Sequence, residues 1–133
     1  MVTENWKPIE GWPGYEVSDY GNVRSFKRSP RNPHGEAYPI KGSVDKWGYG
    51  TVVLVRQNPA TGKRELKCLF RHRLVAQAFI PNDDPINKTL VLHRLSLSWG
   101  GTNHATNLRW GTAKDNYNDS VEDGKRPRKG GHV

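Results

Sequence analysis

The apolar residues in the first half of this chain fall in short stretches that turn-forming residues interrupt. Residues 15–18 and 23–26 alternate apolar and polar side chains, which is typical of strands with one buried face. Residues 51–55 form a third candidate strand. Glycine and asparagine at residues 19–22 favour a turn between the first two strands. The sequence therefore predicts a β-rich amino-terminal half.

The second half changes its apolar period from that of strands to that of a helix. Residues 65–70 are expected to return as a strand after a hairpin loop. Apolar residues then recur on one helical face, so we expect a short helix over residues 71–80 that Pro81 ends. Residues 90–93 form an apolar strand that ends in a histidine. Thr112 is a good amino-terminal cap for a last helix through about residue 121.

Three segments are expected to be irregular. Residues 27–40 contain three prolines and several charges, which indicates an exposed loop. Residues 94–106 form a polar, glycine-bearing loop. Residues 124–133 carry four cations among three glycines and a proline, which predicts a flexible basic tail.

The composition limits what the chain can do. Only 34% of the 133 residues are hydrophobic and the mean hydropathy is -0.84, so a large core is not expected and a bound metal or partner would help to stabilise the fold. The single cysteine, Cys68, excludes an internal disulfide and a multi-cysteine zinc site. Neither a membrane span nor a signal peptide is evident, so we expect a cytoplasmic protein with no membrane partner.

The balance of charge points to a polyanionic partner. Lysine and arginine number 21 against 13 aspartate and glutamate residues, which gives a formal charge of +8 and an isoelectric point near 9.8. Such an excess favours nucleic acid. A basic structural protein of a ribosome or virion has the same composition and remains an alternative.

Two patterns carry a resemblance to known families. Residues 6–11 (WKPIEG) and 15–25 (YEVSDYGNVRS) resemble the fourth type of the NUMOD motifs, which accompany HNH nuclease cores. Residues 72–81 (HRLVAQAFIP), His93, residues 107–112 (NLRWGT) and Asn116 are similar to phage and homing HNH endonucleases. The resemblance implies a nuclease core in which a two-stranded ribbon and a helix hold one divalent metal ion.

The resemblance assigns roles to three residues. His93 would be the general base, Asn107 would brace the loop, and Asn116 would bind Mg²⁺ or Mn²⁺. The chemistry agrees, because a neutral imidazole with a pKa near 6.5 can deprotonate water and an amide oxygen is a hard ligand. A metal ion would relieve charge on the scissile phosphate.

The sequence departs from this family beside the general base. The position before His93 normally supplies a second metal ligand, but here it is Leu92, and the aspartate that is common two positions after the histidine is Leu95. Asp119 lies one helical turn after Asn116 and could replace the missing carboxylate, although an exposed charge is an equal alternative. His104 is expected to be a solvated loop residue, and His72 a packing or orienting residue.

Contacts to DNA are expected from basic side chains, which neutralise phosphates. The candidates are Arg24, Lys27, Arg28, Arg94 and Arg109, with Lys125, Arg126, Arg128 and Lys129 in the tail. Four aromatic residues could stack on bases, but a core role is favoured for them in so small a fold: Trp6, Trp12, Tyr15 and Tyr20.

The sequence thus predicts an α+β protein with three parts. Residues 1–57 would be a NUMOD-type β-rich DNA-contacting module, residues 58–121 an HNH ββα-metal core, and residues 122–133 a basic tail. We expect a metal-dependent endonuclease that acts on double-stranded DNA in the cytoplasm of a bacterium that carries a phage. The alternative is an HNH-derived protein that binds DNA with impaired catalysis, which Leu92 favours. Recognition sequence and oligomeric state are not encoded in these patterns.

Overall fold

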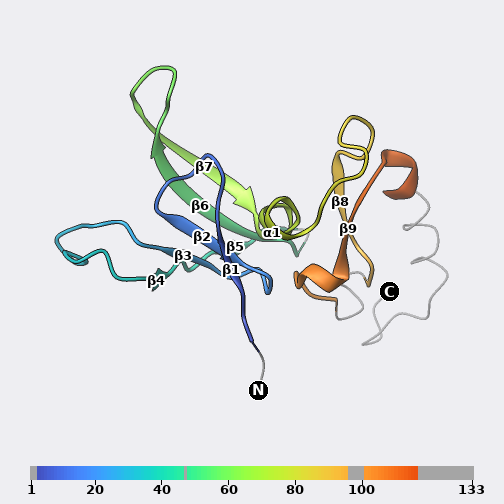
Figure 1. The fold of residues 1–133 in the computed structure, drawn as a ribbon, viewed down its shortest axis with the longest axis horizontal. Coiled ribbons are helices and arrows are strands. Elements are labelled where there is room, and N and C mark those ends of the chain that lie inside the picture. Colours follow the sequence, from blue (N-terminus) through green and yellow to red (C-terminus); the bar gives the residue numbers. More distant parts are fainter. Residues whose placement is uncertain (1–2, 47, 96–100, 117–133) are drawn as a thin grey trace.

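The computed structural model describes residues 3–46, 48–95 and 101–116, and these are mostly strands with few helices (Figure 1). The elements are, in chain order, β1 (Trp6–Pro8), β2 (Tyr15–Ser18), β3 (Val23–Ser25), β4 (Tyr38–Pro39), β5 (Ser43–Val44), β6 (Gly50–Gln57), β7 (Arg64–Phe70), α1 (Arg71–Phe79), β8 (Leu90–His93), the 3-10 helix η2 (Ala105–Asn107) and β9 (Leu108–Gly111).

The first sheet is antiparallel with the order β1-β2-β3-β4. The turn between β2 and β3 is held by the Ser18 hydroxyl, which accepts hydrogen bonds from the backbone N–H groups of Tyr20 and Asn22 at 3.2 and 3.1 Å. Gly21 has φ of +86° in this turn, a conformation that favours glycine. The predicted strands and turn in this region are confirmed.

The segment 27–40 is more ordered than its prolines suggest. The Asn32 side chain donates to the carbonyls of Lys27 and Glu36 at 3.0 and 2.8 Å and accepts from the Glu36 N–H at 3.1 Å. The segment then ends in β4, which pairs with β3. The prediction of a loop was therefore wrong for residues 38–39, which pair with β3, whereas their predicted exposure is confirmed.

The second sheet has the order β5-β6-β7, and β6 and β7 form the predicted hairpin. Its loop closes where the Asn58 N–H donates to the Lys63 carbonyl at 2.8 Å. The chain then passes directly into α1, which ends at Phe79 with Ile80 as its carboxyl-terminal cap, so the predicted stop before Pro81 is confirmed. Figure 1 places α1 between these sheets and the β8–β9 ribbon.

The β8–β9 ribbon leads into a helical turn at residues 113–116. Thr112 caps this turn, because its hydroxyl accepts from the Asp115 N–H at 3.1 Å while the Asp115 carboxylate accepts from the Thr112 N–H at 3.0 Å. The predicted cap is confirmed, and the rest of that helix lies outside the described residues. Residues 105 and 106, predicted as the end of a loop, belong to η2, which the His104 side chain caps by accepting from the Thr106 N–H.

One apolar cluster lies under both halves of the chain. It consists of Ile9, Trp12, Tyr15, Val17, Val23, Val52, Leu54, Leu74, Val75, Ala76, Val91 and Leu108. The expected boundary after residue 57 falls at the end of β6, whose partner β7 lies beyond it. The two halves therefore share a core. In the part of the chain that the structure describes, no helix is long and apolar enough to span a membrane.

Arg71, the first residue of α1, ties that helix to the first sheet. Its guanidinium donates to the carbonyl of Gly21 at 2.9 Å and to that of Ile40 at 3.3 Å. The side chain is half-buried, so both carbonyls would lose a partner without it.

We expect Arg71→Met to reduce the free energy of unfolding by about 2 kcal/mol, because it leaves two carbonyls without a charged donor. Arg73→Met, two residues further along α1, is the matched control, since Arg73 donates one 3.4 Å bond to Thr89. It should cost less than about 0.5 kcal/mol. Urea unfolding at constant pH measures both values, and equal losses would contradict the role given to Arg71.

Candidate functional site

His93, the last residue of β8, is half-buried and lies in a polar and aromatic setting. Its Nε2 atom lies 2.9 Å from the Oδ1 atom of Asn103. The rings of His72 and Tyr49 have their centroids 5.0 and 5.9 Å from that of His93. Burial lowers the pKa of His93, while the hydrogen bond with Asn103 acts in the opposite direction. The imidazole is therefore neutral at neutral pH and able to accept a proton.

His72 forms the buried wall of this setting. It packs against Phe70 and Tyr49 as well as against His93, with ring centroids 5.4 Å away in the first two cases. Its Nδ1 atom is buried and has no hydrogen-bond partner among the described residues. Burial, with a smaller contribution from His93, lowers the pKa of His72 to about 4. His72 is thus a neutral packing residue, which agrees with the role expected for it.

Asn107 braces the loop between the two strands of the ribbon. Its Oδ1 atom accepts from the Leu95 N–H at 2.8 Å, and its Nδ2 atom donates to the carbonyls of Leu95 and Thr102 at 3.0 and 2.8 Å. The Arg94 N–H also donates to the Asn107 carbonyl, at 2.6 Å. One asparagine therefore joins both ends of the loop.

The same loop is fixed to the first sheet. The Ala105 N–H donates to the Asp19 carbonyl at 2.8 Å. The His104 ring packs edge-on against Tyr20, with centroids 4.4 Å apart, while its Nδ1 atom bonds the Thr106 hydroxyl at 2.8 Å. His104 was expected to be a solvated loop histidine, but it has structural contacts on both sides.

The opposite face of the ribbon holds Leu92, which is 6% exposed. A β-carbon added to Gly111 would lie 2.5 Å from Leu92 Cδ1 and 3.3 Å from Asp115 Oδ2, so both side chains approach the same point above β9. The helical turn with Asp115 and Asn116 therefore passes over the Leu92 side of the ribbon. Leu92, at the position where the sequence resemblance predicts a metal ligand, is therefore a buried apolar side chain.

The fit of the site to a divalent metal ion rests on Asn116. Its amide oxygen is a ligand that Mg²⁺ accepts, whereas Leu92 supplies none. Asp119 lies outside the described residues. Among the residues that are described, no three His, Cys, Asp or Glu side chains are grouped closely enough to hold a metal ion.

The basic residues predicted to contact DNA fall into three groups. Arg24 and Lys27 already have partners: Arg24 forms a 2.7 Å ion pair with Glu16, and Lys27 donates to the Val55 carbonyl. Arg109 belongs to the same group, because its Nη1 atom lies 4.0 Å from the Oδ2 atom of Asp115. Arg28 and Arg94 are exposed. The tail residues Lys125, Arg126, Arg128 and Lys129 lie outside the described residues.

The four aromatic residues of the first module divide between core and surface. Trp12 and Tyr15 are buried in the shared cluster, as favoured from the sequence. Trp6 lies beneath the Arg24 guanidinium, whose Cζ atom is 4.0 Å from the centroid of the Trp6 ring. Tyr20 is exposed and contacts His104. None of these rings needs a nucleic-acid base to explain its position in the fold.

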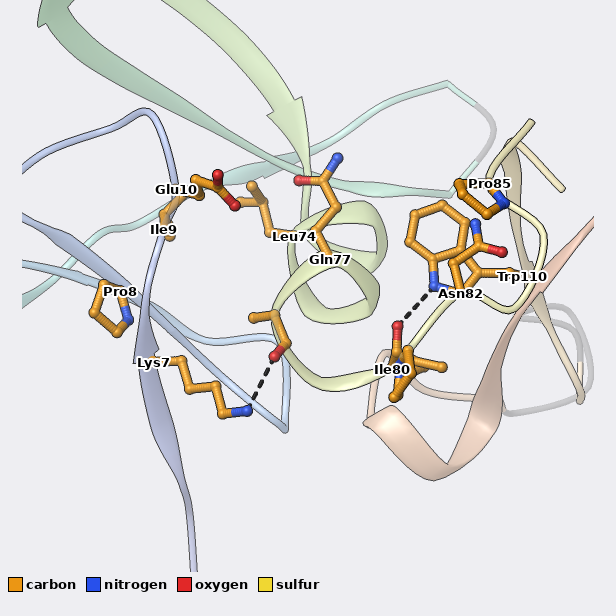
Figure 2. A pocket seen from close by; sticks show the side chains of 12 residues that line it. Lys7, Pro8, Ile9, Glu10, Leu74, Gln77, Ile80, Asn82, Pro85 and Trp110 are labelled. Carbon is orange, nitrogen blue, oxygen red and sulfur yellow. Dashed lines mark hydrogen bonds between the residues drawn. The ribbon is translucent and has the colours of Figure 1, made fainter.

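A pocket of about 930 Å³ lies between β1, the end of α1 and β9, away from His93 (Figure 2). Two of its polar side chains are bonded to the backbone of the chain. Lys7 Nζ donates to the Ala78 carbonyl at 3.1 Å, and Trp110 Nε1 donates to the Ile80 carbonyl at 2.9 Å. We interpret this pocket as a gap between packed secondary-structure elements, and we place the candidate site at His93.

Two residues of this site were missed by the sequence reasoning. Asn103, which bonds His93, lies in a segment that looks like any polar loop. Tyr49, beside His93, follows a turn that reads only as a break between strands. Because both come into place through long-range packing, spacing along the chain gives no signal for either.

The comparisons with known proteins agree with the predicted resemblance. A family model of the NUMOD4 motif matches residues 4–64. The chain is also 33% identical over 122 residues to an uncharacterized HNH endonuclease of Acanthamoeba polyphaga mimivirus, an alignment that covers 90% of this chain. The chain spans 27% of the length of that relative. No solved structure shows significant similarity to this chain.

The chain therefore contains a NUMOD4 motif and is similar to an HNH endonuclease over most of its own length, which confirms the resemblance found in the sequence. The NUMOD4 match ends within the β6–β7 hairpin, whereas the relative aligns with both halves of the shared core.

The low pKa of His72 predicts how stability depends on pH. Its folded value of about 4 is below the 6.5 expected when unfolded, so the unfolded chain binds more protons between these values. The contribution of His72 to the free energy of unfolding is therefore fully present above about pH 6.5 and is lost as the pH falls toward 4. Between pH 7.5 and 4.5 this residue should account for a loss of about 2 to 3 kcal/mol.

Urea unfolding of the parent and of His72→Leu at both pH values isolates this contribution, because the other groups titrate in both proteins. The exposed His34, changed to leucine, is the matched control and should leave the pH dependence of the parent intact. If His72→Leu loses as much stability as the parent on acidification, His72 is not the group responsible.

Proposed function

We propose that this chain is a DNA endonuclease that hydrolyses phosphodiester bonds with His93 as its general base. The observation that carries this proposal is the setting of His93: half-buried, hydrogen-bonded through Nε2 to Asn103, and with a pKa below its usual range. Such an imidazole is neutral at physiological pH and can take a proton from water. The hydroxide would attack phosphorus, and one ester P–O bond would break.

The loop that follows His93 is held ready for this chemistry. Asn107 bonds Leu95 and Thr102 on the two sides of the loop, so the backbone around the histidine does not have to be ordered when DNA arrives. A base that is held in position avoids the entropic cost of finding its geometry during the reaction. Asn107 is therefore proposed as a bracing residue, with no proton to transfer.

A divalent metal ion, Mg²⁺ or Mn²⁺, bound by Asn116 and by Asp119 would stabilise the charge of the phosphate and of the leaving oxygen. Asn116 lies in the turn that Thr112 caps, so its position on the ribbon is fixed by the capping box. Because Leu92 supplies no ligand, the proposed metal site has only Asn116 and Asp119 as its protein ligands. Water and DNA phosphate would have to complete the coordination, so metal affinity should depend on DNA.

Double-stranded DNA is the proposed substrate. The formal charge of +8 attracts the phosphate backbone, and Arg28 and Arg94 are exposed. Arg94 directly follows His93, so a phosphate that it binds would lie close to the proposed base. Arg24 and Lys27, whose cationic groups already have partners in the protein, would stabilise the first module more than they contact DNA.

A protein that binds DNA without cutting it is the second candidate. Leu92 is the observation that favours it, because a buried apolar side chain stands where the sequence resemblance leads us to expect a metal ligand. The two candidates share the same DNA-contacting surface and differ only in turnover. Nicking of supercoiled plasmid with Mg²⁺ or Mn²⁺, tested with and without EDTA, separates them.

We expect His93→Ala to abolish nicking while DNA affinity stays within about threefold of the parent, because imidazole acts in the chemical step and phosphate contacts supply binding. His34→Ala removes an exposed histidine and should nick at the parental rate. Plasmid nicking and a gel-shift titration measure the two properties. Parental cleavage by His93→Ala would show that another group is the base.

We expect Leu92→Asp to bind metal more tightly and to nick faster in millimolar Mg²⁺, because it adds a carboxylate to the proposed site. Without metal the variant should be less stable, since it buries a charge near Asp115. Leu92→Asn is the matched control, because it has the same shape and an oxygen ligand but no charge. It should improve metal binding less than the aspartate does.

Calorimetric titration of Mg²⁺ into the parent and both variants, together with a cleavage time course, measures this effect. The parent should bind Mg²⁺ weakly in the absence of DNA. Tight binding by the parent alone would mean that a complete site exists elsewhere, and the assignment of the metal to Asn116 and Asp119 would then fail.

A further inference from the structure

The hydrogen bond between His93 and Asn103 decides which nitrogen of the histidine carries the proton. Asn103 presents its Oδ1 atom at 2.9 Å, and an amide oxygen can only accept. The Nε2 atom must therefore donate. In the neutral ring the proton sits on Nε2, and Nδ1 is left with the lone pair that a base requires.

The other neighbours of His93 are aromatic rings. His72 and Tyr49 contact its ring, and His72 is itself neutral at working pH, with a pKa of about 4. These tilted ring contacts restrict where the imidazole can lie, but they do not favour either tautomer. The amide of Asn103 makes that selection.

Asn103 is held in turn by the first module. A β-carbon added to Gly21, in the turn between β2 and β3, would lie only 2.9 Å from the β-carbon of Asn103. The turn also anchors the loop through the 2.8 Å bond from the Ala105 N–H to the Asp19 carbonyl. Asn107 adds the 2.8 Å bond to the Thr102 carbonyl, next to Asn103 in the chain.

We propose that Asn103 is a positioning residue that fixes His93 in its Nε2–H tautomer, and that the Asp19–Gly21 turn of the NUMOD4 module holds Asn103 in place. The module would then contribute to the nuclease site itself in addition to contacting DNA. That His93 is a base rests on the proposed function. The tautomer and its dependence on Asn103 do not, so they can be tested separately.

Long-range ¹H–¹⁵N correlation spectra of the ¹⁵N-labelled full chain, recorded at pH 8, report the tautomer of His93 directly, and His93→Gln assigns its signals. We expect the parent to be the Nε2–H form. Asn103→Leu should lose that preference and give a mixture, and Asn103→Asp should keep it, because the carboxylate still accepts. Asn87→Leu, an exposed asparagine away from the site, should leave the spectrum of His93 unchanged.

The same variants are then assayed on plasmid DNA. We expect Asn103→Leu to lower the rate of nicking at saturating protein by about tenfold to hundredfold, with DNA affinity within about twofold of the parent. Asn103→Asp should recover more of the rate than Asn103→Leu. A general loss of folding would instead lower affinity and rate together in both variants.

The role of the turn is tested with Gly21→Ala. Both Gly21 and Gly62 have positive φ, at +86° and +71°, but a β-carbon at Gly62 would meet nothing within 4 Å. Gly62→Ala is therefore matched for backbone strain and lacks the contact with Asn103. We expect Gly21→Ala to change the tautomer signals of His93 and Gly62→Ala to leave them unchanged.

An Nδ1–H tautomer in the parent, or unchanged tautomer signals in Asn103→Leu, would overturn the proposal. Unchanged signals in folded Gly21→Ala would overturn the part assigned to the turn. If the parent holds the Nε2–H form through Asn103 but does not nick DNA, the positioning is upheld and the proposed endonuclease function fails.

Discussion

The structure depends on the burial of one short helix between two sets of strands. Leu74, Val75 and Ala76 of α1 are almost completely buried, and α1 contacts strands from β2 in the first sheet to β9 in the ribbon. A chain with only 34% hydrophobic residues cannot form two independent cores of useful size. Since each half buries its apolar face against the same helix, neither half completes its core alone.

The sequence predicted the elements whose signals are local. Alternation gave β2 and β3, Pro81 gave the end of α1, and Thr112 gave the cap of the last helical turn. The short strands β1, β4 and β5 were not predicted, because they have only two or three residues and, unlike β3, no buried residue that would show an alternation. Their pairing is decided by the neighbouring strand.

The candidate site was predictable to a similar extent. His93 and Asn107 were singled out by their spacing along the chain, and their roles in the site stay predictions, although Asn107 bonds the loop on both sides. The ring contacts of His72 and Tyr49 with His93 could not be derived, since each joins segments far apart in the chain. The partners of Arg24 and Lys27 were equally hidden, because an excess of cations does not tell which ones the fold itself uses.

The close packing of Gly21 on Asn103 bears on how such proteins can be recombined. DNA-contacting modules are attractive units for exchange between endonucleases, since a new module would redirect an unchanged nuclease. In this chain the turn from Asp19 to Gly21 packs against the loop after His93 and accepts a hydrogen bond from it. A chimera joined after β6 would separate two surfaces that fit each other. The turn and the loop have to be transferred, and selected, as one unit.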